Sequence, residues 1–154
     1  MKLYLVQHGE AVAKEDDPDR PLSDKGMTDV KHIARALTYA RVEVERVIHS
    51  GKLRAQQTAE ILVGEIAPGV QLEIHDQIRP NDNPGTFDLL SDNQNTDIMV
   101  VGHLPFMAKL VSHLVAGDDS LALVVYRPGS IVCLETIEAD NWQINWMLRP
   151  KLLE

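Results

Sequence analysis

Two histidines of this sequence each follow a short apolar run. His8 comes after "LYLVQ" (3–7), and His103 comes after "MVVG" (99–102). Short apolar runs that end at turn residues are typical of buried strands. In open α/β sheets, the carboxyl ends of parallel strands meet at one edge, where binding sites form. We therefore expect His8 and His103 to lie in one pocket.

Two arginines are expected to add positive charge to this pocket. A third short strand, "RVIH" (46–49), precedes a helical pattern that carries Arg54 in its first turn. An arginine placed there leans back toward the start of the helix, where free N–H groups and the helix dipole also attract anions. Arg20 lies in the polar loop that follows the first strand. These residues predict an oxyanion-binding pocket in a chain whose net charge is −8.

The remaining sequence supplies the elements that must position these side chains. We expect Ser23 and Ser50 to cap two helices, and Asn83 followed by Pro84 to begin another. Residues 107–115 repeat apolar side chains at helical spacing until Gly117. Strands are expected at 3–6, 46–49, 70–75 and 97–103, and around the turn signal at 127–129, at 121–126 and 130–137, with a last strand at 141–148.

Strands that alternate with helices predict an α/β fold with a mainly parallel central sheet between layers of helices. The strands near the carboxyl end follow one another with short connections, so we expect them to be antiparallel. The sequence shows no repeat, low-complexity tract or linker, and its 154 residues suit one domain spanning 1–154.

Composition narrows the classes of partner and location. A net charge of −8 argues against nucleic acid, and no run reaches the ~18 apolar residues of a membrane span. The first apolar run is too short for a signal peptide, and a single cysteine, Cys133, suits a reducing compartment, so a cytoplasmic location is expected. No metal-ligand spacing and no glycine-rich nucleotide loop is present, so neither a metal nor a cofactor is expected.

Four motifs, in the same order and spacing, resemble those of the histidine phosphatase superfamily, and most closely its small SixA-type phosphohistidine phosphatases. They are "QHGEA" (7–11), "DRPLSDKG" (19–26), "HSGKLRAQQTAE" (49–60) and "VVGHLP" (100–105). The resemblance covers nearly the whole chain and implies a phosphoglycerate mutase-like fold. The segment between His75 and Asp97 is too short for the cap of larger members, so no cap domain is expected.

The resemblance also implies a role for each matched residue. His8 would be the nucleophile and form a phosphohistidine intermediate, which suits a neutral imidazole nitrogen. Arg54 and His103 would bind the phosphoryl oxygens, their positive charge stabilising the transition state. Arg20 would be a further cation at the rim, and Gly9 would let the backbone approach the phosphate closely.

The sequence departs from the family in two places. Gln7 stands where the family has an arginine that grips phosphate, and exchanging a charged fork for one neutral NH₂ costs about 10-fold in binding or rate. The family often places an acidic proton donor shortly after the third strand. Here Glu10, Asp76 and Asp82 are all candidates for that donor, and a phosphohistidine substrate needs it less because imidazole is readily protonated.

These observations favour a phosphatase that removes phosphate from phosphohistidine in a phosphorylated protein, without a metal. A second hypothesis is an enzyme for a small phosphorylated metabolite. A third, motivated by Gln7, is a phosphate-binding regulatory module with weakened or lost activity.

Overall fold

The computed structural model of this chain describes residues 1–88, 95–138 and 140–154. Within these residues, six strands form one sheet in the order β3-β2-β4-β1-β5-β6. The first four strands are parallel to one another, whereas β5 is antiparallel to β1 and β6 is antiparallel to β5. This confirms the mainly parallel sheet with antiparallel carboxyl-terminal strands. The strands are β1 (Lys2–Gln7), β2 (Arg46–His49), β3 (Leu72–Ile74), β4 (Ile98–Gly102), β5 (Ile131–Thr136) and β6 (Trp142–Leu148).

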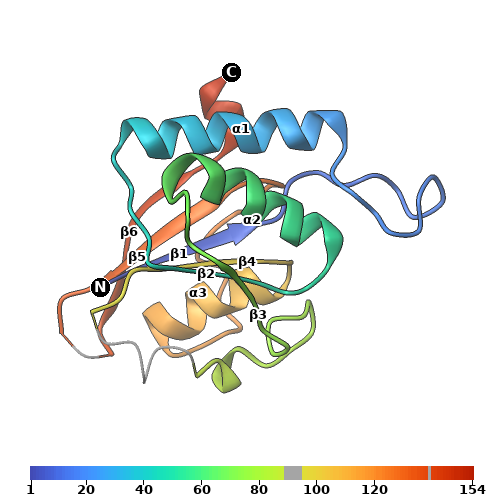
Figure 1. Cartoon of the computed structure of the whole chain (residues 1–154). Coiled ribbons are helices and arrows are strands. Elements are labelled where there is room, and N and C mark those ends of the chain that lie inside the picture. The colour runs from blue at the N-terminus through green and yellow to red at the C-terminus, as the bar shows by residue number, and fades with distance from the viewer. Residues whose placement is uncertain (89–94, 139) are drawn as a thin grey trace.

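Helices cover both faces of the sheet, as predicted. Figure 1 shows α1 (Asp24–Tyr39) and α2 (Leu53–Ile66) on one side and α3 (Phe106–Ala116) on the other. Alternate side chains of β1 are buried on opposite faces of the sheet. Tyr4 and Val6 are buried in the cluster under α1 and α2. Leu3 and Leu5 are buried in the cluster under α3. Every apolar side chain of the strand is therefore inside, which explains its unbroken apolar run.

The predicted start of α1 and the predicted end of α3 are confirmed. The Ser23 hydroxyl accepts a hydrogen bond from the Gly26 N–H at 3.0 Å, which satisfies one of the free donors at the start of α1. α3 ends at Gly117, which adopts a left-handed conformation with φ of 70°. Both signals are local, so the sequence is sufficient to predict them.

The predicted cap of α2 is wrong. The helix begins at Leu53 after Lys52, which makes no side-chain cap, and Ser50 lies outside it. The intervening Gly51 has a φ of 84°, so the chain turns away from helical geometry there. The Ser50 hydroxyl instead lies 2.5 Å from His103 Nε2.

The strand expected at 121–126 is also absent. These residues have no regular secondary structure, and Leu121, Leu123 and Val125 are exposed. Within the described part of the sheet, β5 already has β1 on one side and β6 on the other, so no edge of β5 remains for this segment.

The connection from β3 to β4 contains a short 3-10 helix, η1 (Pro84–Thr86). The Asn83 side chain caps it by accepting from the Gly85 N–H at 2.8 Å, as predicted. Any continuation of this predicted helix into 89–94 lies outside the described residues. A second short helix, η2 (Pro150–Leu153), places Leu153 against the cluster under α1. None of the described helices is long and apolar enough to cross a membrane.

Candidate active site

The ends of β1 and β4 bring His8 and His103 together. The two strands are parallel neighbours, with Gln7 opposite Gly102, so the residues that follow them are adjacent. The His8 N–H donates to the Gly102 carbonyl at 3.0 Å, which continues the sheet pairing by one residue. The two imidazole rings are tilted by 56° and their centroids lie 4.9 Å apart.

The His8 ring is held with one nitrogen free to act as a base or nucleophile. Its Nδ1 lies 2.7 Å from the Gly9 carbonyl, which can only accept, so Nδ1 carries the proton. The other nitrogen, Nε2, therefore has a lone pair, toward which the Arg54 Nε–H donates at 3.3 Å. The pKa of His8 is lowered to about 4, mainly by burial and also by the positive charges of Arg54 and Arg20, against a raising effect of the Gly9 hydrogen bond. His8 is thus neutral near pH 7, as a nucleophilic imidazole must be.

Arg54 and Arg20 reach this cluster from two different elements. Arg54 lies in the first turn of α2, where the helix dipole also favours anions. Arg20 lies in the loop between β1 and α1, and its Nε–H donates to the Val12 carbonyl at 3.1 Å. Burial lowers the pKa of Arg54, and the charge of Arg20 lowers it further. Two cations this close favour binding of an anion between them.

His103 is almost completely buried, with 2% of its surface exposed. The pKa of this residue is lowered to about 3, mainly by burial and also by the nearby charges. His103 is therefore a neutral hydrogen-bonding group near pH 7, which differs from the expectation that it contributes a positive charge.

Two residues of the motif at 49–60 have positions that the sequence reasoning missed. Thr58, which is fully buried, accepts from the Gly9 N–H at 3.0 Å and donates to the Arg54 carbonyl at 2.7 Å. The side chain of Gln57 accepts from the Leu22 N–H at 2.8 Å and so fixes the end of the loop that carries Arg20. Their place beside Arg54 in one motif was the only signal, because the bonds to Gly9 and Leu22 join segments far apart in the sequence.

Gly9 has a packing role that differs from the one expected. A Cβ on this residue would lie 2.8 Å from the Val30 Cγ2 atom and 3.1 Å from the Gly26 carbonyl oxygen of α1. Its N–H is already bound to Thr58. Glycine is therefore required here for close contact with α1, and this contact fixes the backbone that follows His8.

Gln7 lies in the last position of β1, and only 8% of its surface is exposed. Its backbone N–H donates to the Ser130 carbonyl at 3.0 Å. Among the described residues, its side-chain Oε1 is buried without a hydrogen-bond partner. A buried acceptor without a partner lowers the free energy of unfolding by about 1–3 kcal/mol. No hydrogen bond within the described residues therefore explains why a polar side chain lies here.

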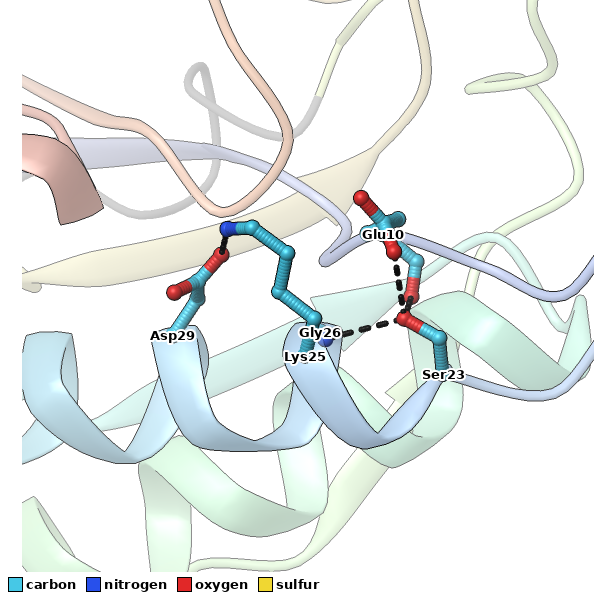
Figure 2. A network of polar contacts seen from close by, with 5 residues as sticks. All are labelled: Glu10, Ser23, Lys25, Gly26 and Asp29. Carbon is cyan, nitrogen blue, oxygen red and sulfur yellow. Dashed lines mark hydrogen bonds and ion pairs between the residues drawn. The ribbon is translucent and has the colours of Figure 1, made fainter.

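The three candidate proton donors are not joined to His8 by any hydrogen bond or ion pair within the described residues. Figure 2 shows Glu10 at the start of α1, where the Ser23 hydroxyl donates to its carboxylate at 2.8 Å. The Asp82 carboxylate accepts from the Arg79 N–H at 2.7 Å, and Asp76 is exposed.

Figure 2 also shows why the chain after Glu10 lies so close to α1. A Cβ on Gly26 would collide with the Glu10 carbonyl oxygen, so only glycine permits this approach. Further along the helix, the buried carboxylate of Asp29 pairs with Lys25 at 2.5 Å.

In the part of the chain that the structure describes, no three His, Cys, Asp or Glu side chains form a group that could hold a metal ion.

Comparisons with known proteins agree with this arrangement. The sequence profile of the histidine phosphatase superfamily (branch 1) matches residues 3–82. The phosphohistidine phosphatase SixA of Escherichia coli (strain K12) is 26% identical, over 97% of this chain and 94% of that protein. An uncharacterized protein of Picosynechococcus sp. is 31% identical, over 85% of this chain and 83% of its own length. The solved structure of the protein histidine phosphatase SixA complexed with tungstate has a TM-score of 0.87 and 26% identity, over 100% of both chains.

Proposed function

This chain belongs to the histidine phosphatase superfamily and is a phosphatase, and we propose that it hydrolyses phosphohistidine in a phosphorylated protein through His8. One observation carries the proposal. His8 has its Nδ1 proton bound by the Gly9 carbonyl, while its Nε2 lone pair lies beside Arg54 and the His103 ring. A neutral nucleophile surrounded by donors to an anion is what phosphoryl transfer requires.

The reaction follows from this geometry in two steps. First, His8 Nε2 attacks the phosphorus, the bond between phosphorus and the substrate imidazole breaks, and the leaving imidazole takes up a proton. Second, a water molecule attacks the phosphorus on His8, the new N–P bond breaks, and inorganic phosphate leaves. The Gly9 carbonyl holds the Nδ1–H throughout and stabilises the charge that the ring gains in the intermediate.

Arg54, Arg20 and His103 would bind the phosphoryl oxygens and stabilise the charge of the transition state. Arg54 is already in contact with His8 Nε2, and the charge of Arg20 acts on both histidines. Gln7 would add a neutral hydrogen bond where the family has an arginine. In the related SixA structure, tungstate is bound, and tungstate is a tetrahedral oxyanion with the shape of phosphate.

The chemistry of the leaving group favours phosphohistidine over a phosphate ester. An alkoxide leaving group needs a proton donor at the site, whereas imidazole is protonated readily by water. The carboxylates of Glu10 and Asp82 accept hydrogen bonds from the Ser23 hydroxyl and the Arg79 N–H, and Asp76 is exposed, so no contact among the described residues directs any of the three toward a leaving group. The relative from Escherichia coli is itself a phosphohistidine phosphatase. We include a cytoplasmic location in the proposal, because Cys133 is buried and unpaired, as suits a reducing compartment.

Rates on two substrate classes test the proposal. We expect kcat/KM for a phosphohistidine-containing protein to exceed that for sugar or nucleotide phosphates by about 100-fold, the contribution of a general acid that the esters would lack. Rapid denaturation at high pH during turnover should trap phosphate on His8, and His8→Ala should lose both label and phosphate release. Equal rates on the esters would favour a metabolite phosphatase, and phosphate binding without turnover would favour a regulatory module.

A further inference from the structure

The two ring nitrogens of His103 have different surroundings. Nε2 lies 2.5 Å from the Ser50 hydroxyl, which comes from the end of β2. Nδ1 is buried and has no hydrogen-bond partner in residues 1–88, 95–138 or 140–154. Since a neutral imidazole has one N–H and one lone pair, the direction of the Ser50 bond decides which of them Nδ1 presents.

The backbone around Ser50 favours the hydroxyl as the donor. The Lys52 N–H points at the Ser50 oxygen from 3.5 Å, a long contact that uses one of the two lone pairs of this oxygen. The hydroxyl proton is then free to point at His103 Nε2. In the opposite arrangement, two N–H groups would share the Ser50 oxygen, and its own proton would need another acceptor.

A rigid turn holds Ser50 in this position. The Gly51 N–H donates to the Nδ1 of His49 at 3.1 Å, and His49 has only 3% of its surface exposed. Gly51 adopts a φ of 84°, which residues other than glycine rarely adopt. The turn therefore holds the Ser50 hydroxyl beside the His103 ring.

We propose that Ser50 is a positioning residue that fixes the tautomer of His103, with the proton on Nδ1 available to a phosphoryl oxygen. The His103 ring lies 4.9 Å from the His8 ring, so a phosphoryl group on His8 would be its neighbour. A buried N–H without a partner binds an anion strongly, because folding has already removed it from water and binding costs it no further desolvation. The part of this inference that concerns turnover rests on the proposed function, whereas the tautomer does not.

The tautomer can be measured directly by nitrogen NMR of the whole chain with labelled histidine. At pH 7.5, we expect His103 to have a protonated Nδ1 and a bare Nε2. In Ser50→Ala, the two forms should mix, whereas Ser50→Thr, which keeps the hydroxyl, should restore the single form. A protonated Nε2 in the unchanged protein would overturn the proposal, as would a single Nδ1–H form that persists in Ser50→Ala.

Binding and turnover give a second readout. Loss of one positioned hydrogen bond is worth up to about 10-fold, so inorganic phosphate should bind Ser50→Ala about 10-fold more weakly, and kcat should fall by about as much. Ser120→Ala, at an exposed loop position, is the matched control. If the chain hydrolyses no phosphohistidine, the proposed function fails, but the tautomer and the phosphate affinity still test Ser50. Unchanged phosphate affinity in Ser50→Ala would refute its role in binding.

Discussion

The Nε–H of Arg54 donates to the Nε2 atom of His8 at 3.3 Å, although 46 residues separate the two in the sequence. This contact places a permanent cation beside a ring nitrogen that is neutral near pH 7. A guanidinium has further N–H donors in the same plane, and these can bind phosphoryl oxygens when phosphorus approaches Nε2. The contact therefore aligns the proposed nucleophile with the charge that would stabilise its reaction.

Replacing Arg54 by lysine keeps the charge but removes the planar set of donors. We expect kcat/KM for phosphohistidine to fall by about 100-fold in Arg54→Lys, because one positioned donor to a developing oxyanion is worth about 100- to 1,000-fold and the retained charge recovers part of it. Phosphate release from a phosphohistidine protein measures this. Arg35→Lys, on the exposed face of α1, should keep full activity. A rate for Arg54→Lys close to that of this control would contradict the role of the planar donors.

The buried histidines predict that the protein loses stability in mild acid. The pKa of His8 is lowered from 6.5 to about 4, and that of His103 to about 3, mainly by burial. The unfolded chain therefore binds more protons than the folded chain below pH 6.5, so their contribution to stability is complete above pH 6.5. It should be lost progressively as the pH falls toward 4 and then toward 3.

Urea unfolding at pH 7.5, 6, 5 and 4.5 measures this effect. His8→Gln cannot be protonated, so its free energy of unfolding should fall less steeply over this range than that of the unchanged protein. Carboxylates also titrate here, but they contribute equally to both proteins. His113→Gln, in the last turn of α3 and outside the site, should show the full slope. Parallel slopes for His8→Gln and the unchanged protein would show that His8 has an ordinary pKa.

Thr58 links the backbone after His8 to the helix that carries Arg54, so its hydroxyl should matter for both stability and rate. Thr58→Val keeps the shape but leaves the buried Gly9 N–H without its acceptor, which should lower the free energy of unfolding by about 1–3 kcal/mol. Thr58→Ser keeps the hydroxyl and should be milder. Phosphate release should fall in Thr58→Val, because the Gly9 carbonyl that orients His8 loses its anchor. Equal stability of the valine and serine variants would mean that the hydrogen bond contributes little.

The sequence was sufficient to predict the layered fold because the strand and helix signals are local. The apolar run before His8, the Ser23 cap and Gly117 each specify structure within a few residues. The rule that parallel strands end at one edge also predicted that His8 and His103 would meet. The prediction failed for residues 121–126. Their apolar pattern suits a strand, but β5 is already paired with β1 and β6 in the described sheet.

The hydrogen bonds that hold the site together could not be predicted in this way. Ser50 and His103 are 53 residues apart, and Gly9 and Thr58 are 49 apart. A serine just before a helical pattern predicts a cap, and only the three-dimensional position of His103 shows that its hydroxyl is used elsewhere. The charge of His103 could not be predicted either. The sequence shows a histidine at this position, whereas the burial that keeps it neutral depends on the folded structure.

Gln7 is expected to limit the rate of the natural protein. Gln7→Arg would supply the charged fork of the family and should raise kcat/KM for phosphohistidine by about 10-fold. It would also add a third cation near Arg54 and Arg20, so the variant should unfold at lower urea unless inorganic phosphate is present. Gln7→Met removes the unpartnered Oε1 and should be more stable but slower. Equal rates for the natural protein and Gln7→Arg would show that the glutamine does not weaken the enzyme.

Gly9 and Gly64 offer a matched pair of glycine replacements. In Gly9→Ala, the new Cβ would lie 2.8 Å from Val30 Cγ2 and 3.1 Å from a carbonyl oxygen of α1, so the helix must shift, at about 1–3 kcal/mol. Gly64 lies within α2 with no atom near its Cβ position, so Gly64→Ala should instead gain about 1 kcal/mol from helix propensity. Adding Val30→Ala to Gly9→Ala removes the closest contact and should recover part of the loss in urea unfolding. If Gly9→Ala is as stable as the unchanged protein, packing against α1 does not explain the glycine, and close approach to phosphate becomes the better explanation.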